Sequence, residues 1–145
     1  MRNFNWIIIL FIGINLFLSS CKKKDNENTC TLNELNLTGS YKVESVRYKA
    51  TPTSPETDGS SLFFDGCALD DITTFNADHT YTYTDAGTMC TPAGDDNGTW
   101  SLSGSTLTID GLPAIVENFS CSNFSLSQSD INAAGDKITI TWKKQ

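Results

Sequence analysis

Basic residues are missing from the middle of this 145-residue chain. No Lys or Arg occurs between Lys49 and Lys137, whereas acidic residues occur throughout that interval, from Glu56 to Asp136. The formal net charge of the whole chain is -7. Because proteins that bind nucleic acid need clustered basic side chains to neutralise phosphates, this distribution disfavours a nucleic-acid partner, and we expect none. We interpret the acidity as a property that keeps the protein soluble, with cation binding as the alternative.

Residue combinations that carry out catalysis are also lacking. The single histidine, His79, lies in a predicted turn, and no Gly-x-Ser-x-Gly sequence is present. Two pairs of adjacent carboxylates occur, Asp70 with Asp71 and Asp95 with Asp96. Neighbours on a strand point to opposite faces of a sheet, so neither pair is expected to form an acid and base couple. The sequence therefore predicts a protein that is not an enzyme and uses no cofactor.

Spacings typical of metal sites are absent as well. No Cys-x-x-Cys pair occurs, so we do not expect a zinc site. The segment from Gly94 to Gly98 is rich in oxygen ligands, but it lacks the regular spacing and the distal Glu of an EF-hand loop. We interpret this segment as a solvated turn, with a calcium loop as the alternative, and expect no metal.

One long apolar run is present, from Trp6 to Leu18, and Arg2 precedes it. Its length of about 13 residues is typical of an export signal and is shorter than the roughly 20 that a membrane-spanning helix needs. The residues that follow, Leu-Ser-Ser-Cys at 18–21, resemble the lipobox of bacterial lipoproteins. This resemblance implies a signal peptide over residues 1–20, fatty acyl groups such as palmitate on Cys21, and a lipid anchor in the outer membrane of the cell envelope. The alternative is a soluble export signal followed by an incidental cysteine.

Residues 21–36 are polar and show no hydrophobic period, which predicts a lipidated tether. Three basic residues, Lys22 to Lys24, follow the anchor directly, and such side chains are attracted to anionic head groups at a bilayer surface. A solvated linker explains them equally well. The remaining residues, 37–145, have the size of one domain.

Four cysteines remain once Cys21 is assigned to lipid: Cys30, Cys67, Cys90 and Cys121. An even number in an exported chain predicts two disulfides, and four cysteines allow three pairings. Cys67 and Cys90 flank a predicted hairpin, which favours a bond between them. Cys30 would then pair with Cys121 and tie the N-terminal segment to the wall of the domain.

Short runs of alternating hydrophobicity, separated by turn residues, continue from Ser40 to the C-terminus. This pattern predicts an all-β domain of about eight antiparallel strands, which would close into an up-and-down barrel; a β-sandwich is the alternative. In the first run, the apolar positions change face near Ser45, which predicts a bulge there. The expected strands cover residues 40–50, 69–76, 80–85, 99–102, 106–110, 114–119, 124–128 and 138–143.

The residues from Leu37 to Val43 resemble the Leu-x-Gly-x-Trp start of lipocalin-like barrels, with Tyr41 in the place of the usual Trp. Residues 67–71, 74–81 and 98–102, together with Cys90, resemble lipocalin-like domain lipoproteins of the Bacteroidetes type. His79 stands where Gly is common in that family. The resemblance implies a small barrel over residues 37–143, in a family whose ligands are generally not established.

Two functions are compatible with these features. The first is a membrane-anchored binding protein, whose barrel admits a small hydrophobic ligand at an open end walled by loops 51–61 and 86–97. The candidates for lining this pocket are Phe63, Phe64, Phe75, Tyr81, Tyr83, Trp100, Phe119, Phe124 and Trp142. Such aromatic side chains also form ordinary cores, so the alternative is a non-enzymatic interaction or structural protein with a filled barrel. In both cases we expect a monomeric domain.

Overall fold

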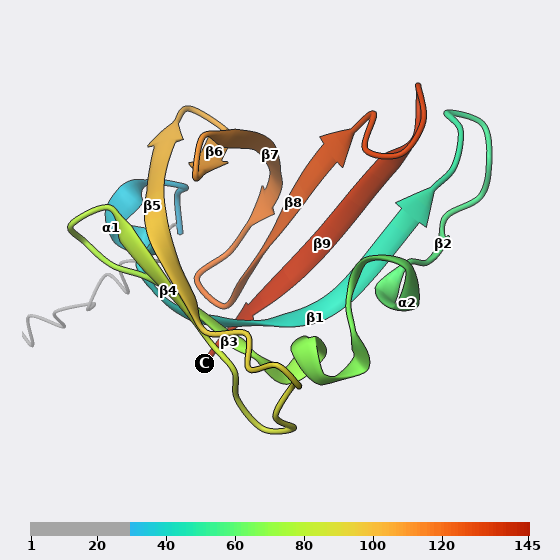
Figure 1. Ribbon diagram of the computed structural model, residues 1–145. Coiled ribbons are helices and arrows are strands. Elements are labelled where there is room, and N and C mark those ends of the chain that lie inside the picture. Colours follow the sequence, from blue (N-terminus) through green and yellow to red (C-terminus); the bar gives the residue numbers. More distant parts are fainter. Residues whose placement is uncertain (1–29) are drawn as a thin grey trace, which may run out of the picture.

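A computed structural model describes residues 30–145 of the chain. The predicted signal peptide, Cys21 and the tether as far as residue 29 lie outside the described residues. The nine strands of the described part are β1 (Gly39–Lys49), β2 (Thr57–Asp58), β3 (Ile72–Phe75), β4 (Thr80–Thr84), β5 (Asp96–Ser103), β6 (Thr106–Ile109), β7 (Leu112–Phe119), β8 (Asn123–Ser129) and β9 (Lys137–Lys144), as Figure 1 shows.

These strands form one antiparallel sheet that closes on itself. Each strand from β3 to β8 pairs with the next one in the chain, and β1 pairs with both β3 and β9. Eight strands therefore form the ring, and the two-residue β2 pairs with β1 outside it. The predicted all-β barrel is confirmed, whereas the sandwich alternative is wrong because there is a single sheet. The ring is visible in Figure 1, where β9 runs between β8 and β1.

Strand β1 is long because it contributes to two sides of the ring. Its first residues, Gly39 to Lys42, pair with β3, and nearly its whole length pairs with β9. The register with β9 shifts between Val43 and Ser45, which makes Glu44 the extra residue of a bulge and confirms the bulge predicted from the sequence. The bulge lets both Tyr41 and Val46 be buried although their spacing is odd.

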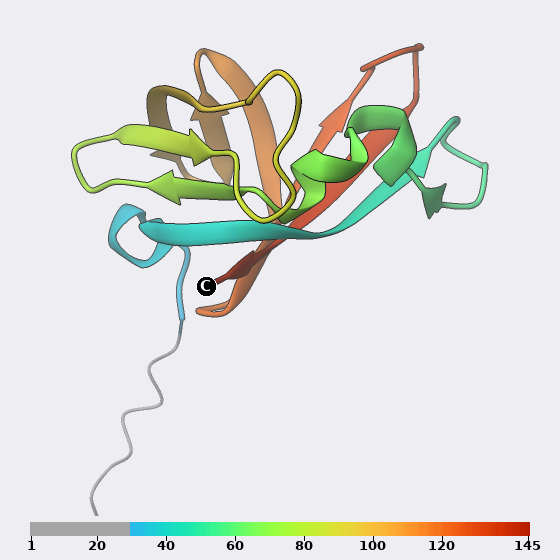
Figure 2. The same ribbon diagram turned by 60° about the horizontal axis from the view of Figure 1, so that its bottom comes forward.

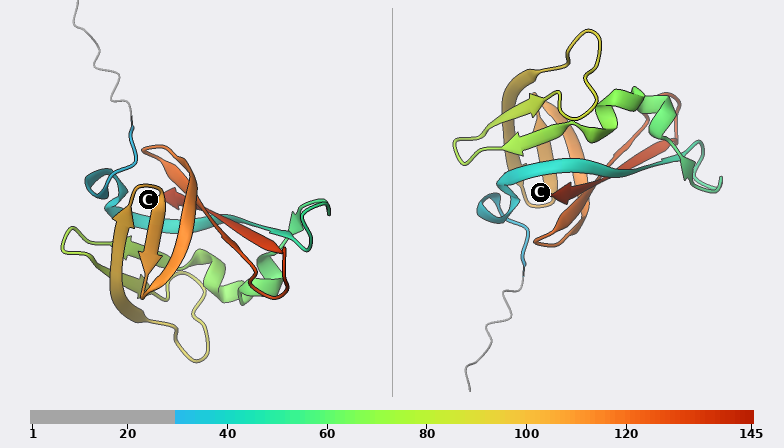
Figure 3. Two further views of the ribbon diagram at one scale, coloured as in Figure 1. Left: turned by 90° about the horizontal axis from the view of Figure 1, so that it is seen from above. Right: turned by 90° about the horizontal axis from the view of Figure 1, so that it is seen from below.

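The connections between consecutive ring strands alternate between the two ends of the barrel. The turns at residues 76–79, 104–105 and 120–122 lie at one end, which we call the closed end. The connections at 85–95, 110–111 and 130–136 lie at the other, which we call the open end. Figures 2 and 3 show a different helical segment beside each half of β1: α1 near its start, and α2 with η1 along its second half.

Residues 30–36 correct the predicted extent of the tether. Instead of a polar linker, they belong to the folded unit: Cys30 is bonded to Cys121, Leu32 packs against the core, and α1 (Glu34–Leu37) follows. The Asn33 side chain caps α1 by accepting a hydrogen bond from the backbone N–H of Asn36 at 2.8 Å. A four-residue helix is too short to show a hydrophobic period, which explains why the sequence pattern did not predict it.

Two further short helices connect β2 to β3. They are α2 (Ser60–Phe63) and the 3-10 helix η1 (Gly66–Asp70), and both contact β1. The apolar residues Leu62 to Phe64 therefore belong to a helix and its end, and Asp70 precedes the strand in which the sequence placed it. Among residues 30–145, no helix is both long and apolar enough to cross a bilayer.

Candidate ligand cavity

The closed end of the barrel is filled by an aromatic core. Phe75 lies at its centre, with ring centroids 6.0 Å from Tyr41, 5.6 Å from Trp100 and 6.2 Å from Phe124, each in an edge-to-face arrangement. All four side chains are buried. This half of the barrel interior is therefore packed and leaves no room for a ligand.

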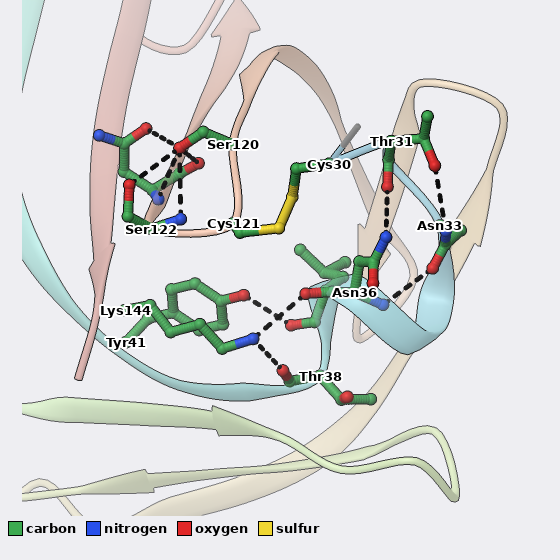
Figure 4. The surroundings of a disulfide bond; sticks show 12 residues. Cys30, Thr31, Asn33, Asn36, Thr38, Tyr41, Ser120, Cys121, Ser122 and Lys144 are labelled. Carbon is green, nitrogen blue, oxygen red and sulfur yellow. Dashed lines mark hydrogen bonds between the residues drawn. A yellow bond between two sulfur atoms is a disulfide. The ribbon is translucent and has the colours of Figure 1, made fainter. Parts of the chain in front are cut away.

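The segment that includes α1 covers this end like a plug. The hydroxyl of Tyr41 donates to the carbonyl of Leu37 at 2.9 Å, and Leu37 itself is fully buried. The Lys144 ammonium donates to the carbonyls of Asn36 at 3.2 Å and Thr38 at 2.7 Å, as Figure 4 shows beside the Cys30–Cys121 disulfide. Both termini of the described part are thus fixed at the closed end.

A cavity of about 310 Å³ occupies the interior toward the open end. Strands β6 to β9 form most of its apolar wall, to which β4 adds Tyr81. The aliphatic side chains of the wall are Ile109, Leu112, Ala114, Leu126, Ile138 and Ile140. Its volume falls at the lower end of the range for small-molecule sites, about 300–1,000 Å³.

Trp142 forms the floor between the cavity and the packed core. Its indole ring stacks on Phe124, with centroids 6.0 Å apart and an interplanar angle of 8°. Its Nε1–H is buried and has no hydrogen-bond partner within residues 30–145. Buried donors without a hydrogen bond are rare in native proteins, so the Trp142 N–H is an unusual feature of the cavity floor.

One charged side chain, Asp110, lies in the wall of the cavity. Its carboxylate accepts hydrogen bonds from the Tyr81 hydroxyl and, at 2.9 Å, from the backbone N–H of Thr99. Gly98 provides the space, because a Cβ atom on that residue would lie 2.1 Å from a carboxylate oxygen of Asp110. The Asp110 backbone adopts the left-handed conformation, with φ of 48°, which Asp tolerates better than most residues.

This contact shifts the pKa of both side chains. The hydrogen bond to Asp110 raises the pKa of Tyr81 to about 12, with burial as a second cause. The same hydrogen bond and the Thr99 N–H hold the pKa of Asp110 below its usual value. At neutral pH the wall therefore contains a carboxylate anion and a protonated phenol.

Of the nine aromatic residues predicted to line a pocket, two line this cavity, Tyr81 and Trp142. The other seven lie elsewhere. Phe75, Trp100 and Phe124 form the closed-end core, and Tyr83 and Phe119 pack at its margin.

The last two are outside the ring. Phe63 on α2 packs against Tyr48, with ring centroids 5.3 Å apart, and Phe64 borders a separate hollow between α2 and η1. The aliphatic wall was not predicted, although the alternation of Ile138, Ile140 and Trp142 in the sequence places these three side chains on one face.

The two loops expected to wall the open end contribute no residue to the lining of the cavity. Loop 86–95 is held by buried carboxylates instead. Asp85 accepts hydrogen bonds from the backbone N–H of Cys90 at 3.0 Å and of Gly94 at 3.2 Å, and Asp71 accepts from Ala86 at 2.8 Å. With 3% and 7% exposure, Asp71 and Asp85 do not serve solubility, which corrects the interpretation of the acidity for these two residues.

A carboxylate and sulfur group near this loop has distances compatible with a metal site. Ligand atoms of Asp71, Asp85 and Cys90 lie within 4.8 Å of one another. Cys90 is bonded to Cys67, so it offers no thiolate. The two disulfides, Cys67–Cys90 and Cys30–Cys121, have the pairing that the hairpin argument favours.

The segment proposed as a calcium loop is partly strand. Asp96 to Gly98 begin β5 and pair with β4, and the Asp95 carboxylate accepts the backbone N–H of Asp85 at 2.7 Å. His79 also has a structural environment: its Nε2 lies 3.3 Å from the Glu34 carboxylate on the exterior.

A wider hollow of about 560 Å³ lies on the exterior of the closed end. It is bordered by Leu32 to Leu35, Leu102 and Gly104, and it is open to solvent. Leu35 is 78% exposed there. Because it lacks enclosing walls and convergent polar groups, we regard the barrel cavity as the better candidate site.

Residues 37–144 match the family model of the lipocalin-like domain. The chain belongs to the lipocalin-like domain family. The match spans every ring strand, from β1 to β9, so the barrel and its cavity are both parts of the lipocalin-like domain. No curated protein matches the chain.

Proposed function

We propose that this lipocalin-like domain binds a small apolar molecule in the cavity at its open end, and that it does so while held at a membrane by a lipid on Cys21. The observation that carries the first part is the cavity itself. Half of the barrel is packed with aromatic side chains, whereas the other half has an apolar wall around about 310 Å³ of space. Well-packed interiors seldom contain voids of this size, which supports a role for the space in binding.

Aliphatic walls and one floor of aromatic rings suit an apolar ligand. Burial of such a ligand contributes about 25 cal/mol for each Å² of apolar surface removed from water. The described residues that line the cavity do not form a pair of nucleophile and base, and the family has a fold that is generally not enzymatic, so we propose binding rather than catalysis.

The anchor rests on the sequence at residues 18–21, which resembles a lipobox, and on the export signal that precedes it. We propose a lipoprotein of the Bacteroidetes type, located in the outer membrane of the cell envelope. Mass spectrometry of the protein purified from its native membranes should find Cys21 as the first residue, carrying acyl chains. A mature chain that begins elsewhere, or an unmodified Cys21, would refute the anchor without affecting the cavity.

Ligand binding can be tested with N-phenyl-1-naphthylamine, an uncharged dye whose fluorescence rises in apolar sites. We expect saturable binding by the purified protein and an increase in the melting temperature that grows with dye concentration. The cavity-filling variant Ala114→Phe should lose this binding, because the side chain of Ala114 lies in the wall.

The matched control is Ile115→Phe on the same strand. Ile115 is 46% exposed on the outer face of β7, so its substitution introduces the same side chain outside the barrel. Binding should survive in this variant. If the dye does not bind the native protein, or binds both variants equally, the cavity is not a ligand site and the alternative of a filled interaction barrel is favoured.

A further inference from the structure

We infer that the cavity selects its ligand by charge: it takes an apolar molecule with a cationic head group, and it rejects one with a carboxylate, such as a fatty acid. This inference rests on the proposed function, since it specifies which apolar molecules the cavity accepts. It follows from the position of Asp110, from the absence of basic side chains in the wall, and from the contacts that the nearby lysines already make.

The backbone conformation of Asp110 and the contacts of its carboxylate fix the position of this side chain. It occupies the turn between β6 and β7 at the open end, with a left-handed backbone. Its carboxylate folds over Gly98, where no side chain competes for the space, and receives hydrogen bonds from Tyr81 and the Thr99 N–H. These donors fix the anion in the wall and leave further acceptor positions on its oxygens, because two carboxylate oxygens offer about four.

Among residues 30–145, no basic side chain lines the cavity. The three lysines of β9 are the nearest along the strand that forms its floor. Lys137 pairs with Glu117, Lys143 lies 3.9 Å from Glu44, and Lys144 donates to backbone carbonyls at the closed end. Lys137 and Lys143 are separated from Ile138 and Trp142 by an odd number of positions along β9, so their side chains point to the outer face of the sheet.

Asp110 is exposed at the mouth of the cavity, so the head group of a ligand beside it would stay in contact with water. A ligand carboxylate at this position would be repelled by the Asp110 carboxylate and would find no cation in the lining to pair with. A cationic head group at the same position would be attracted to Asp110. Clefts lined by charge of one sign concentrate the opposite charge, and the interval between Lys49 and Lys137, which includes Asp110, contains acidic residues but no basic ones.

Three decyl compounds that differ only in the head group test this inference: decylamine, 1-decanol and decanoate, each below its micelle concentration. At neutral pH they carry a positive, a zero and a negative charge. We expect displacement of N-phenyl-1-naphthylamine in the order amine, alcohol, carboxylate. Because Asp110 is exposed to solvent, the amine should bind about tenfold more tightly than the carboxylate at low ionic strength, and this ratio should fall as salt is added.

The variant Asp110→Asn should reduce the ratio to about twofold or less, because it removes the charge while Asn tolerates the left-handed backbone. Asp130→Asn is the matched control. Asp130 also has a left-handed backbone, with φ of 59°, lies in a connection at the same end, and does not line the cavity. It changes the net charge equally, so the order and the ratio should persist in this variant.

The outcomes separate the two proposals. If the dye binds but decanoate displaces it as well as decylamine does, charge selection is wrong and the binding function stands. Charge selection is also wrong if Asp110→Asn and Asp130→Asn reduce the ratio equally, or if no decyl compound displaces bound dye. If neither the dye nor any decyl compound binds, the proposed function itself fails.

Discussion

The Cys30–Cys121 disulfide should contribute more to stability than Cys67–Cys90. Its cysteines are 91 positions apart in the sequence, compared with 23 for the other bond. A cross-link removes conformational freedom from the unfolded chain, and in the chain-entropy description its effect grows with the logarithm of the loop length. For loops of these lengths, the stabilisation is about 4.6 kcal/mol for the first bond and about 3.4 kcal/mol for the second.

The two loops are nested, which slightly changes this difference. With Cys67–Cys90 intact, the unfolded chain between Cys30 and Cys121 is already shortened, and the expected contribution of the outer bond falls to about 4.4 kcal/mol. In the folded state, a second effect increases the contribution of the Cys30–Cys121 bond to stability. Cys30 holds Leu32 and α1 against the core, so removal of the bond also weakens the plug of the closed end.

The measurement is urea unfolding at equilibrium, followed by tryptophan fluorescence, on two double variants that leave no free thiol. Cys30→Ser with Cys121→Ser should lose about 4 to 5 kcal/mol, and Cys67→Ser with Cys90→Ser about 3 kcal/mol. Both variants should show a larger dependence on urea concentration, because their unfolded chains are less compact. A smaller loss for the outer pair than for the inner pair would refute the reasoning from loop length and would indicate that native packing decides.

Three further predictions concern the polar contacts. Gly98→Ala should displace the Asp110 carboxylate, so absorbance titration should show the pKa of Tyr81 moving from about 12 toward 10. Asp136 is fully buried, and although burial alone would raise its pKa, backbone N–H donors and the Tyr48 hydroxyl hold this pKa below the ordinary 3.8. The contribution of Asp136 to stability is present above pH 3.8 and is lost as the pH falls through the lowered pKa. Asp136→Asn should therefore be less stable than the native protein at neutral pH. In unfolding measured at decreasing pH, the variant should lose less free energy of unfolding than the native protein does. The folded state favours the neutral phenol of Tyr81, so the free energy of unfolding should decline as the pH rises from 10 toward 12. A free energy of unfolding that does not change over this range would contradict the raised pKa of Tyr81.

The ring of strands could be predicted because its signals are local. In β9, the alternation of Ile138, Ile140 and Trp142 with polar residues defines an inner and an outer face. In β1, the odd spacing of Tyr41 and Val46 indicates a bulge, which the register confirms at Glu44. Both signals need only the pleat of a strand and one buried face.

The position of the cavity could not be predicted in this way. Whether space remains inside a barrel depends on the summed volume of side chains from strands far apart in the sequence. Large aromatic rings such as Phe75 fill the closed end, whereas a small residue, Ala114, leaves room near the open end. Ranking residues by aromatic character therefore selects the packed half.

Buried carboxylates were another feature that composition could not show. Asp71, Asp85 and Asp136 have less than a tenth of their surface exposed, and they accept backbone N–H groups of the open-end connections. These contacts depend on loop geometry, which has no period in the sequence. From composition alone the three residues are indistinguishable from solvated surface acids.

If Cys21 carries the proposed lipid, the bond between Cys30 and Cys121 also bears on the direction in which the barrel faces. From Cys21 to Cys30 the chain advances nine residues, which can span at most about 30 Å when fully extended. The bond holds Cys30 at the closed end, and the cavity opens at the other. With a lipid on Cys21, the mouth would therefore point away from the bilayer that holds the protein. Ligand exchange would then take place with dissolved molecules or with a second protein that faces this surface, rather than by direct extraction from the membrane beneath.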